Sequence, residues 1–316
     1  SESVLQRLCA NDVGVEPGTV VYTAMLNPRG GIESDLTITR TAEDAYLIVT
    51  GGATATRTLD WIRRNTPDDA HAFLTDVTSG LSVLGLMGPR ARDLLQSLSP
   101  DDLSNDAFPF GTSREIELGF ATVRASRISY VGELGWELYI PSEFTTGVWD
   151  VLVEAGESYG LRQVGMHAMN SLRIEKAYRH YGHDITDADT PLEGGLGFAV
   201  KFDKPGGFVG REALKRQKEA GLNKRLVQFL LGDPDPMLYH NEPIWRDGNL
   251  AGYVRSAMYG HTLGAAVALG YVENPDGVDA EYVNSGTYEI EIAGVRYPAT
   301  ASLRPLYDPK SERIKA

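Results

Sequence analysis

Glu137 and Tyr130 have the types and spacing needed to hold a flat, nitrogen-rich ligand. In RISYVGELGWELYIP, residues 127–141, strand alternation puts Glu137 on the face opposite Trp136. Tyr130 lies seven residues earlier, across a glycine-containing loop that can bend back. A carboxylate accepts two parallel N–H bonds from an amidine-like edge, and an aromatic ring can cover the ligand's face. The pair would suit a pterin or a purine, but the solvent-facing half of an edge strand gives the same alternation.

A second carboxylate, Asp35, follows a tight turn in NPRGGIESDLTITR, residues 27–40. It shares one strand face with Glu33 and Thr37, while the apolar residues of the strand point the other way. A carboxylate in this position can relay protons for a bound ligand, or it can simply face water. The residues alone leave both readings open.

Arg173 falls among apolar residues on a helix expected over residues 165–181. It shares a helical face with Met169 and Ala177. Because an unpaired buried guanidinium is costly, Arg173 either extends to solvent along its stem or pairs with a buried carboxylate.

The elements that must position these groups indicate an α+β architecture, because strands and helices alternate without regular βαβ spacing. Period-2 segments at 20–26, 32–39 and 46–50 predict an antiparallel three-strand meander. A second strand-rich block runs from Arg114 to Ile140. Helical patterns cover residues 54–65, 89–98, 145–156 and 165–181.

The composition shifts near residues 221–231, and short strand candidates with Gly, Asn and Pro punctuation follow. This pattern predicts a small C-terminal β-barrel or jelly-roll-like domain. We therefore expect an α+β region over residues 1–222 and a barrel domain over residues 223–316.

Charge and cysteine content exclude several function classes. The net charge of −13 and dispersed Lys and Arg residues argue against a nucleic-acid partner. No apolar run could cross a bilayer, and the first residues lack the pattern of a secretion signal. The single cysteine, Cys9, excludes an internal disulfide and is expected to be a buried filler, so no metal site is predicted from cysteines.

Three motif matches are weak. Gly156-Glu-Ser158-Tyr-Gly160 fits a nucleophile elbow, but it follows a helical pattern rather than a strand and reads as a Gly-terminated helix end. His180, His183 and Asp184 could offer metal ligands, yet no third partner for the histidine pair is evident. No G-x-G-x-x-G or P-loop is present, so any flavin chemistry would need another polypeptide.

Several runs in order resemble the folate-binding half of the dimethylglycine and sarcosine dehydrogenases and dimethylglycine oxidase. That half is similar to the aminomethyltransferase, or T-protein, of the glycine cleavage system. The runs are SYVGELGWELY, NSLRIEKAYRHYGHDI, TPLEGGLGFAVKFDK, GGFVGREAL and PLYDPKSERIK. The resemblance covers essentially the whole chain and implies interleaved α+β subdomains and a barrel around a central channel. It also implies that a further segment of the family fold precedes Ser1, so that the chain is one part of a larger enzyme.

The resemblance also carries over site residues. Asp35 matches the acid near the reacting folate nitrogens, Glu137 the pterin-edge carboxylate, and Arg173 the arginine of the S-L-R-x-E helix. The T-protein's paired acids are Glu33-Ser34-Asp35 here, so Asp35 alone can take the catalytic role. The implied binding residues are Tyr22, Thr37, Tyr130, Glu137, Arg173 and Tyr307.

The function implied is capture of an iminium or formaldehyde unit from a methylated glycine by tetrahydrofolate, giving 5,10-methylenetetrahydrofolate. FAD would belong to an absent domain or a partner chain. The expected location of the protein is the cytoplasm or, in a eukaryote, the mitochondrial matrix. One alternative is a folate-dependent methyltransferase or demethylase that gives 5-methyltetrahydrofolate. Another is a non-catalytic folate-binding or structural module; the iron–sulfur assembly factors of this fold carry a cysteine where Gly207 stands.

Overall fold

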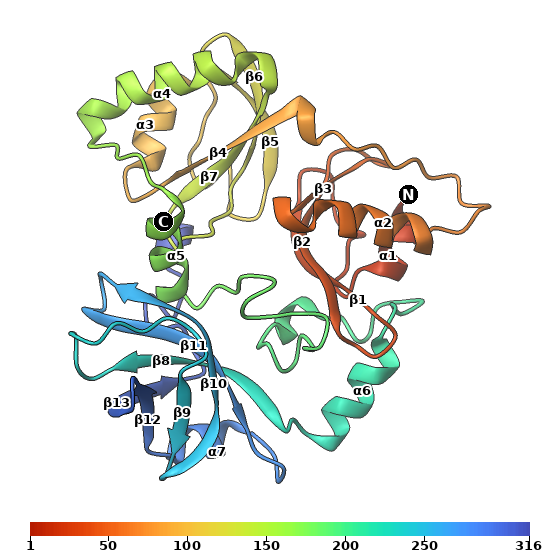
Figure 1. The fold of residues 1–316 in the computed structure, drawn as a ribbon. Helices are drawn as coiled ribbons and strands as arrows, with labels where there is room; N and C mark the ends of the chain where they lie inside the picture. The colour runs from red at the N-terminus through yellow and green to blue at the C-terminus, as the bar shows by residue number, and fades with distance from the viewer.

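The first lobe of the computed structural model, which describes all 316 residues, is built on an antiparallel three-stranded sheet (Figure 1). Its strands lie in the order β1 (Val20–Leu26), β2 (Ile32–Arg40) and β3 (Tyr46–Thr50), which confirms the predicted meander. Helices α1 (Glu2–Leu8) and α2 (Ala55–Asn65) complete this lobe. Cys9 is fully buried in its core, as expected of a filler residue.

The β1–β2 hairpin depends on its two glycines. Gly30 has a left-handed φ of +88°, which closes the turn. A Cβ at Gly31 would lie 2.0 Å from the backbone carbonyl oxygen of Asp187, so glycine lets the loop around Asp187 pack directly on the hairpin. In the resulting register Tyr22 lies opposite Thr37, and Ala24 lies opposite Asp35.

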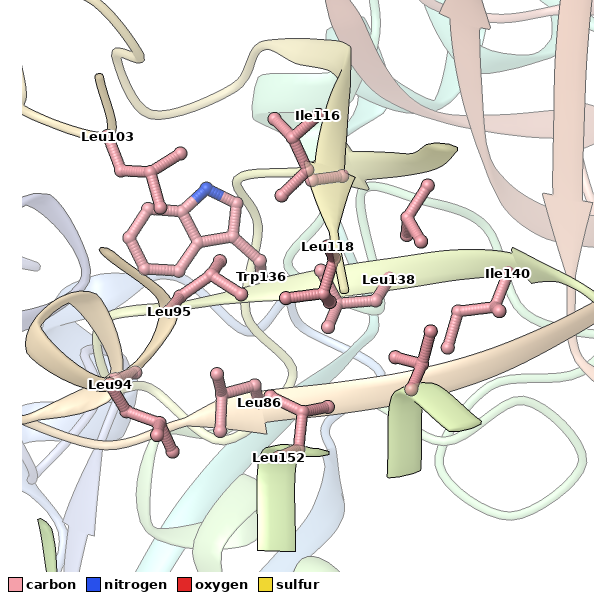
Figure 2. Packing of buried hydrophobic residues seen from close by; sticks show 14 of the residues in the cluster. Leu86, Leu94, Leu95, Leu103, Ile116, Leu118, Trp136, Leu138, Ile140 and Leu152 are labelled. Atoms are coloured by element: carbon pink, nitrogen blue, oxygen red, sulfur yellow. The ribbon is translucent and has the colours of Figure 1, made fainter. Parts of the chain in front are cut away.

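The second lobe is a four-stranded sheet covered on one face by two helices, α3 (Ala91–Leu98) and α4 (Thr145–Tyr159). Trp136, Leu138 and Ile140 point into the core between sheet and helices (Figure 2). The strand order is β4 (Leu81–Met87), β7 (Gly135–Pro141), β6 (Ala121–Ser126) and β5 (Ser113–Leu118).

Helix α4 confirms that the G-x-S-x-G match is not a nucleophile elbow. Ser158 lies within the helix, and Gly160 caps it in the left-handed conformation with a φ of 75°. No strand leads into Ser158, and its exposed hydroxyl donates to the Ala155 carbonyl oxygen of its own helix at 3.0 Å, so the strand–turn–helix geometry of the elbow is absent.

Helix α5 (Met166–Glu175) is shorter than the helix predicted over 165–181. Ala177 adopts a left-handed φ of 55°, and its N–H donates to the Ile174 carbonyl oxygen at 2.9 Å. The N–H of Tyr178 donates to the Arg173 carbonyl oxygen at 3.0 Å. These bonds form a Schellman turn, so the expectation that Arg173 and Ala177 share a helical face is wrong.

The third lobe is a closed six-stranded barrel, which confirms the predicted C-terminal β-barrel. It follows helix α6 (Arg211–Ala220), and helix α7 (Ala280–Ser285) lies between two of its strands in sequence. The domain boundary at 222/223 stays a prediction. No helix has the length and apolar character required to cross a membrane. The strands are β8 (Lys224–Leu231), β9 (Pro243–Arg246), β10 (Asn249–Gly260), β11 (Ala265–Glu273), β12 (Tyr288–Ile292) and β13 (Val295–Ser302).

Candidate active site

Tyr22 and Asp35 form a hydrogen-bonded pair on the half-buried face of the first sheet. The Tyr22 hydroxyl donates to Asp35 Oδ2 at 3.2 Å. Thr37 lies on the same face, directly opposite Tyr22, whereas their strand neighbours Leu36 and Ile38 are buried on the other face. The face that the sequence left open to either reading is therefore a partly enclosed polar surface rather than a freely solvated one.

Burial sets the protonation of this pair. It raises the pKa of the Asp35 carboxyl, an effect that the hydrogen bond from Tyr22 opposes. Burial also raises the pKa of the Tyr22 phenol. The Asp35 carboxylate raises this pKa further, and the Arg179 guanidinium lowers it. The phenol thus stays a donor, and the carboxylate gains affinity for a proton, as a general base requires.

Tyr130 brings the second lobe close to this pair. Its hydroxyl donates to the backbone carbonyl oxygen of Arg179 at 3.0 Å, and its ring stacks on Tyr178 with the centroids 6.2 Å apart. Burial raises the pKa of Tyr130 to about 12; Arg173 opposes this rise, while the nearby carboxylates Asp184 and Asp35 add to it. The two stacked rings are therefore held against the segment that carries Arg179, and the Tyr130 phenol is within electrostatic reach of Asp35.

Glu137 lies on the central strand β7, so the reading as an edge-strand residue is wrong. Its cross-strand neighbours are Gly85 and Ser126, and the glycine leaves space beside the carboxylate. Oε2 accepts a hydrogen bond from the Tyr139 hydroxyl at 2.6 Å, and no protein group donates to Oε1. Burial raises the pKa of Glu137. The free oxygen is an acceptor available to a ligand.

Arg173 is engaged by protein groups. Its Nη1 pairs with Asp184 at 2.5 Å, and the two side chains are 3% and 0% exposed. Nη1 also donates to the Tyr178 carbonyl oxygen at 3.0 Å, and Nη2 donates to Ser256 of the barrel at 3.2 Å. This is the buried pairing that the sequence left open, and it uses the carboxylate next to the His180/His183 pair.

Tyr307 belongs to a C-terminal tail that links the barrel to the second lobe. Its hydroxyl donates to the Glu133 carboxylate, and its pKa is raised chiefly by burial. Beside it, Lys176 and Asp308 form a buried ion pair at 3.0 Å. Tyr307 therefore reaches the loop that joins Tyr130 to Glu137, and its hydroxyl is already in use there.

Sequence reasoning missed three groups around the pair. Phe198 stacks on Tyr22 with the centroids 6.1 Å apart, although Phe198 is 70% exposed. Tyr178 closes the Schellman turn and Arg179 follows it, whereas the sequence pattern predicted helix for the run EKAYRHY that contains both. Nothing in the local sequence marked Phe198, an isolated aromatic after G-L-G, or Arg179, a charged residue in an expected helix, as part of a site.

A cleft of about 700 Å³ opens between the first two lobes. Tyr139, the partner of Glu137, lines it, as does Thr50, whose hydroxyl contacts the Asp35 backbone carbonyl at 3.4 Å. The side chains of Asp35 and Glu137 lie outside its lining.

Two family profiles match the chain in succession. The GCVT N-terminal domain matches residues 1–204, and the glycine cleavage T-protein C-terminal barrel domain matches residues 224–308. The crystal structure of the glycine cleavage system aminomethyltransferase T from Bartonella henselae superposes with a TM-score of 0.82. It covers 97% of this chain and 81% of that chain at 24% identity, which supports the fold.

Longer relatives share higher identity. The 4-methylaminobutanoate oxidase (formaldehyde-forming) of Paenarthrobacter nicotinovorans is 42% identical over 312 residues, which are 99% of this chain and 37% of that protein. The mitochondrial sarcosine dehydrogenase of Homo sapiens is 41% identical over an alignment of 324 positions, gaps included, that covers 98% of this chain and 35% of that protein. The chain thus spans little more than a third of the length of these relatives.

Proposed function

The chain belongs to the glycine cleavage T-protein family, and from this premise we propose that it catalyses tetrahydrofolate-dependent one-carbon transfer. The observation that carries the proposal is the half-buried Tyr22–Asp35 pair, whose carboxyl has a raised pKa. In our proposal an iminium or formaldehyde unit becomes the methylene bridge of 5,10-methylenetetrahydrofolate. Formaldehyde would release water, and an iminium would release its amine.

The residues present fit a reduced pterin. Glu137 Oε1 is free to accept from an amidine-like edge, next to the space left by Gly85. The stacked rings of Tyr130 and Tyr178 offer a flat apolar surface. Bound tetrahydrofolate would supply the two nucleophilic nitrogens, and Asp35 would accept a proton from the nitrogen that gains the new bond.

The remaining predicted binding residues take supporting roles in this proposal. Thr37 extends the polar face beside Tyr22. Arg173 holds Asp184 and the turn that carries Tyr178, so it acts as a positioning residue. Tyr307 fixes the Glu133 loop between the two pterin-binding groups.

We further propose that a flavin-dependent oxidation outside this chain produces the one-carbon unit. The two relatives are named an oxidase and a dehydrogenase, and both names refer to N-methylated amino acids. Removing hydride from such an N-methyl group gives an iminium that hydrolyses to formaldehyde. We propose dimethylglycine or sarcosine as the source of the one-carbon unit. We propose that the protein is located in the cytoplasm or, in a eukaryote, in the mitochondrial matrix.

Calorimetry and product analysis test this function. We expect 5-formyltetrahydrofolate, a stable reduced folate, to bind with measurable heat. We also expect tetrahydrofolate with formaldehyde to give 5,10-methylenetetrahydrofolate faster with the chain than without it. Formation of 5-methyltetrahydrofolate from a methyl donor would favour the methyltransferase alternative. An absence of binding heat with the reduced folate would indicate that the chain is a structural module without a folate site.

Glu137→Gln should weaken binding of the reduced folate by roughly ten- to a hundredfold, because it removes the charge from a charge-assisted hydrogen bond. The dissociation constant from calorimetry measures this. The matched control is Glu115→Gln, on β5 of the same sheet, whose carboxylate is 61% exposed and pairs with Arg124. Equal folate affinity in wild type and Glu137→Gln would remove Glu137 from the site.

A further inference from the structure

Arg179 presents an unused hydrogen-bond donor. It lies in the segment after α5, which runs from that helix toward the first lobe (Figure 1). Nε donates to the Gly194 carbonyl oxygen at 2.8 Å, and Nη1 donates to the Ala177 carbonyl oxygen at 2.6 Å. No protein group accepts a hydrogen bond from Nη2. The nearby Asp184 carboxylate is already bound by Arg173.

The guanidinium is held in a fixed position. Gly195 has a left-handed φ of +70°, and a Cβ there would lie 2.4 Å from Arg179 Nη2. Glycine is therefore what leaves room for the guanidinium. The residue is partly exposed, and Nη2 is not sealed from solvent. Its free N–H groups are therefore open to an acceptor from outside the protein.

That space adjoins the proposed reaction site. The Tyr130 hydroxyl is bonded to the Arg179 backbone, and the Arg179 charge acts on the Tyr22 phenol, which donates to Asp35. The Arg179 guanidinium thus acts on the Tyr22–Asp35 pair and has no carboxylate of its own within the protein. A cation left unpaired by the protein is suited to an anionic group brought by a ligand.

We propose that Arg179 binds the carboxylate of the N-methylated amino acid, or of the iminium made from it, that delivers the one-carbon unit. This inference rests on the proposed function and adds the class of donor: an amino acid that keeps its carboxylate in the site. Nη2 can donate a charge-assisted hydrogen bond to that carboxylate, and this contact orients the methylene carbon. Without that cation, the Asp35 carboxylate would repel the carboxylate of the donor.

Sarcosine and sarcosine methyl ester are the probes for this site. Each is titrated by calorimetry into the chain, with and without saturating 5-formyltetrahydrofolate. We expect sarcosine to bind wild type, and Arg179→Gln to weaken that binding by roughly tenfold or more, the effect of losing a charged hydrogen bond. The ester should bind weakly to both proteins. Arg216→Gln, an exposed arginine on α6, serves as the control and should match wild type.

Gly195→Ala provides a second test that keeps the charge. Its added methyl group should displace the guanidinium and weaken sarcosine binding in the same way, with circular dichroism confirming that both variants fold. Equal sarcosine affinity in wild type and Arg179→Gln, or no sarcosine binding to wild type, would overturn the proposal. So would an Arg179→Gln variant that loses folate affinity and keeps sarcosine affinity. Failure of folate binding in wild type would instead reject the proposed function, since sarcosine is also tested without folate.

Discussion

Asp35→Asn should lower folate-dependent turnover by roughly a hundredfold, the low end of what general acid–base catalysis contributes. The amide keeps the size of the carboxylate and can still accept the Tyr22 hydroxyl, but it cannot take a proton from nitrogen. Affinity for the reduced folate should stay close to wild type, because Glu137 and Tyr130 supply the proposed pterin contacts. Steady-state rates with tetrahydrofolate and formaldehyde, together with calorimetry, separate these two quantities.

Glu33→Gln is the matched control, because Glu33 lies two residues away on the same strand face and binds Arg57 instead. Its turnover should resemble wild type. A wild-type rate in Asp35→Asn would remove Asp35 from the chemistry, and a rate lost equally in Glu33→Gln would point to a general effect on the sheet.

The raised pKa of Asp35 gives this prediction a pH signature. The proton-accepting carboxylate is lost as pH falls through a value above the ordinary aspartate range, so the acid limb of the rate profile should begin there. The folded state binds this proton more tightly than the unfolded state. Stability therefore falls as pH rises from the unfolded pKa through the folded pKa, and the charged form is disfavoured at neutral pH. Asp35→Asn should consequently unfold at an equal or higher temperature at pH 7.

Local alternation was enough to predict the strands that carry the site. On β7, Trp136 and Leu138 fill the core while Glu137 faces the other way, because side chains alternate strictly along a strand. The Tyr22–Asp35 contact lies within a hairpin, so turn chemistry and period together bring the two residues near each other. Strand β4 was missed because its half-exposed run LSVLGLM lacks clear alternation and pairs with β7 about fifty residues later.

The groups around Arg179 could not be predicted because they depend on long-range packing. The helical pattern continues through residues 165–181, and no glycine marks the end of α5; a left-handed alanine, Ala177, ends it instead. The position of the guanidinium then depends on Gly194 and Gly195, more than a dozen residues away. The sequence suggested Arg173 as the ligand-facing arginine by family likeness, whereas the free donor belongs to Arg179.

Asp184→Ala should have the largest effect on stability among the site variants. Asp184 is fully buried and accepts from Arg173 Nη1 and from the His180 N–H, while Ser256 donates to its other oxygen. Removing the carboxylate leaves the Arg173 guanidinium buried and without a counter-charge. Breaking a buried ion pair in this way typically costs about 3–5 kcal/mol. Urea denaturation, compared with wild type at the same pH, measures the loss.

Arg57→Ala calibrates that loss. Arg57 pairs with Glu33 and Asp187, but its side chain is 43% exposed, so removing it should cost at most about 1 kcal/mol. A loss in Asp184→Ala no greater than this would contradict the assignment of Arg173 as a structural residue. If the large loss is found, the same variant should also weaken folate binding, because the Arg173–Asp184 pair anchors the turn that places Tyr178 against Tyr130. The arginine of the family motif would then act on folate through the turn it holds.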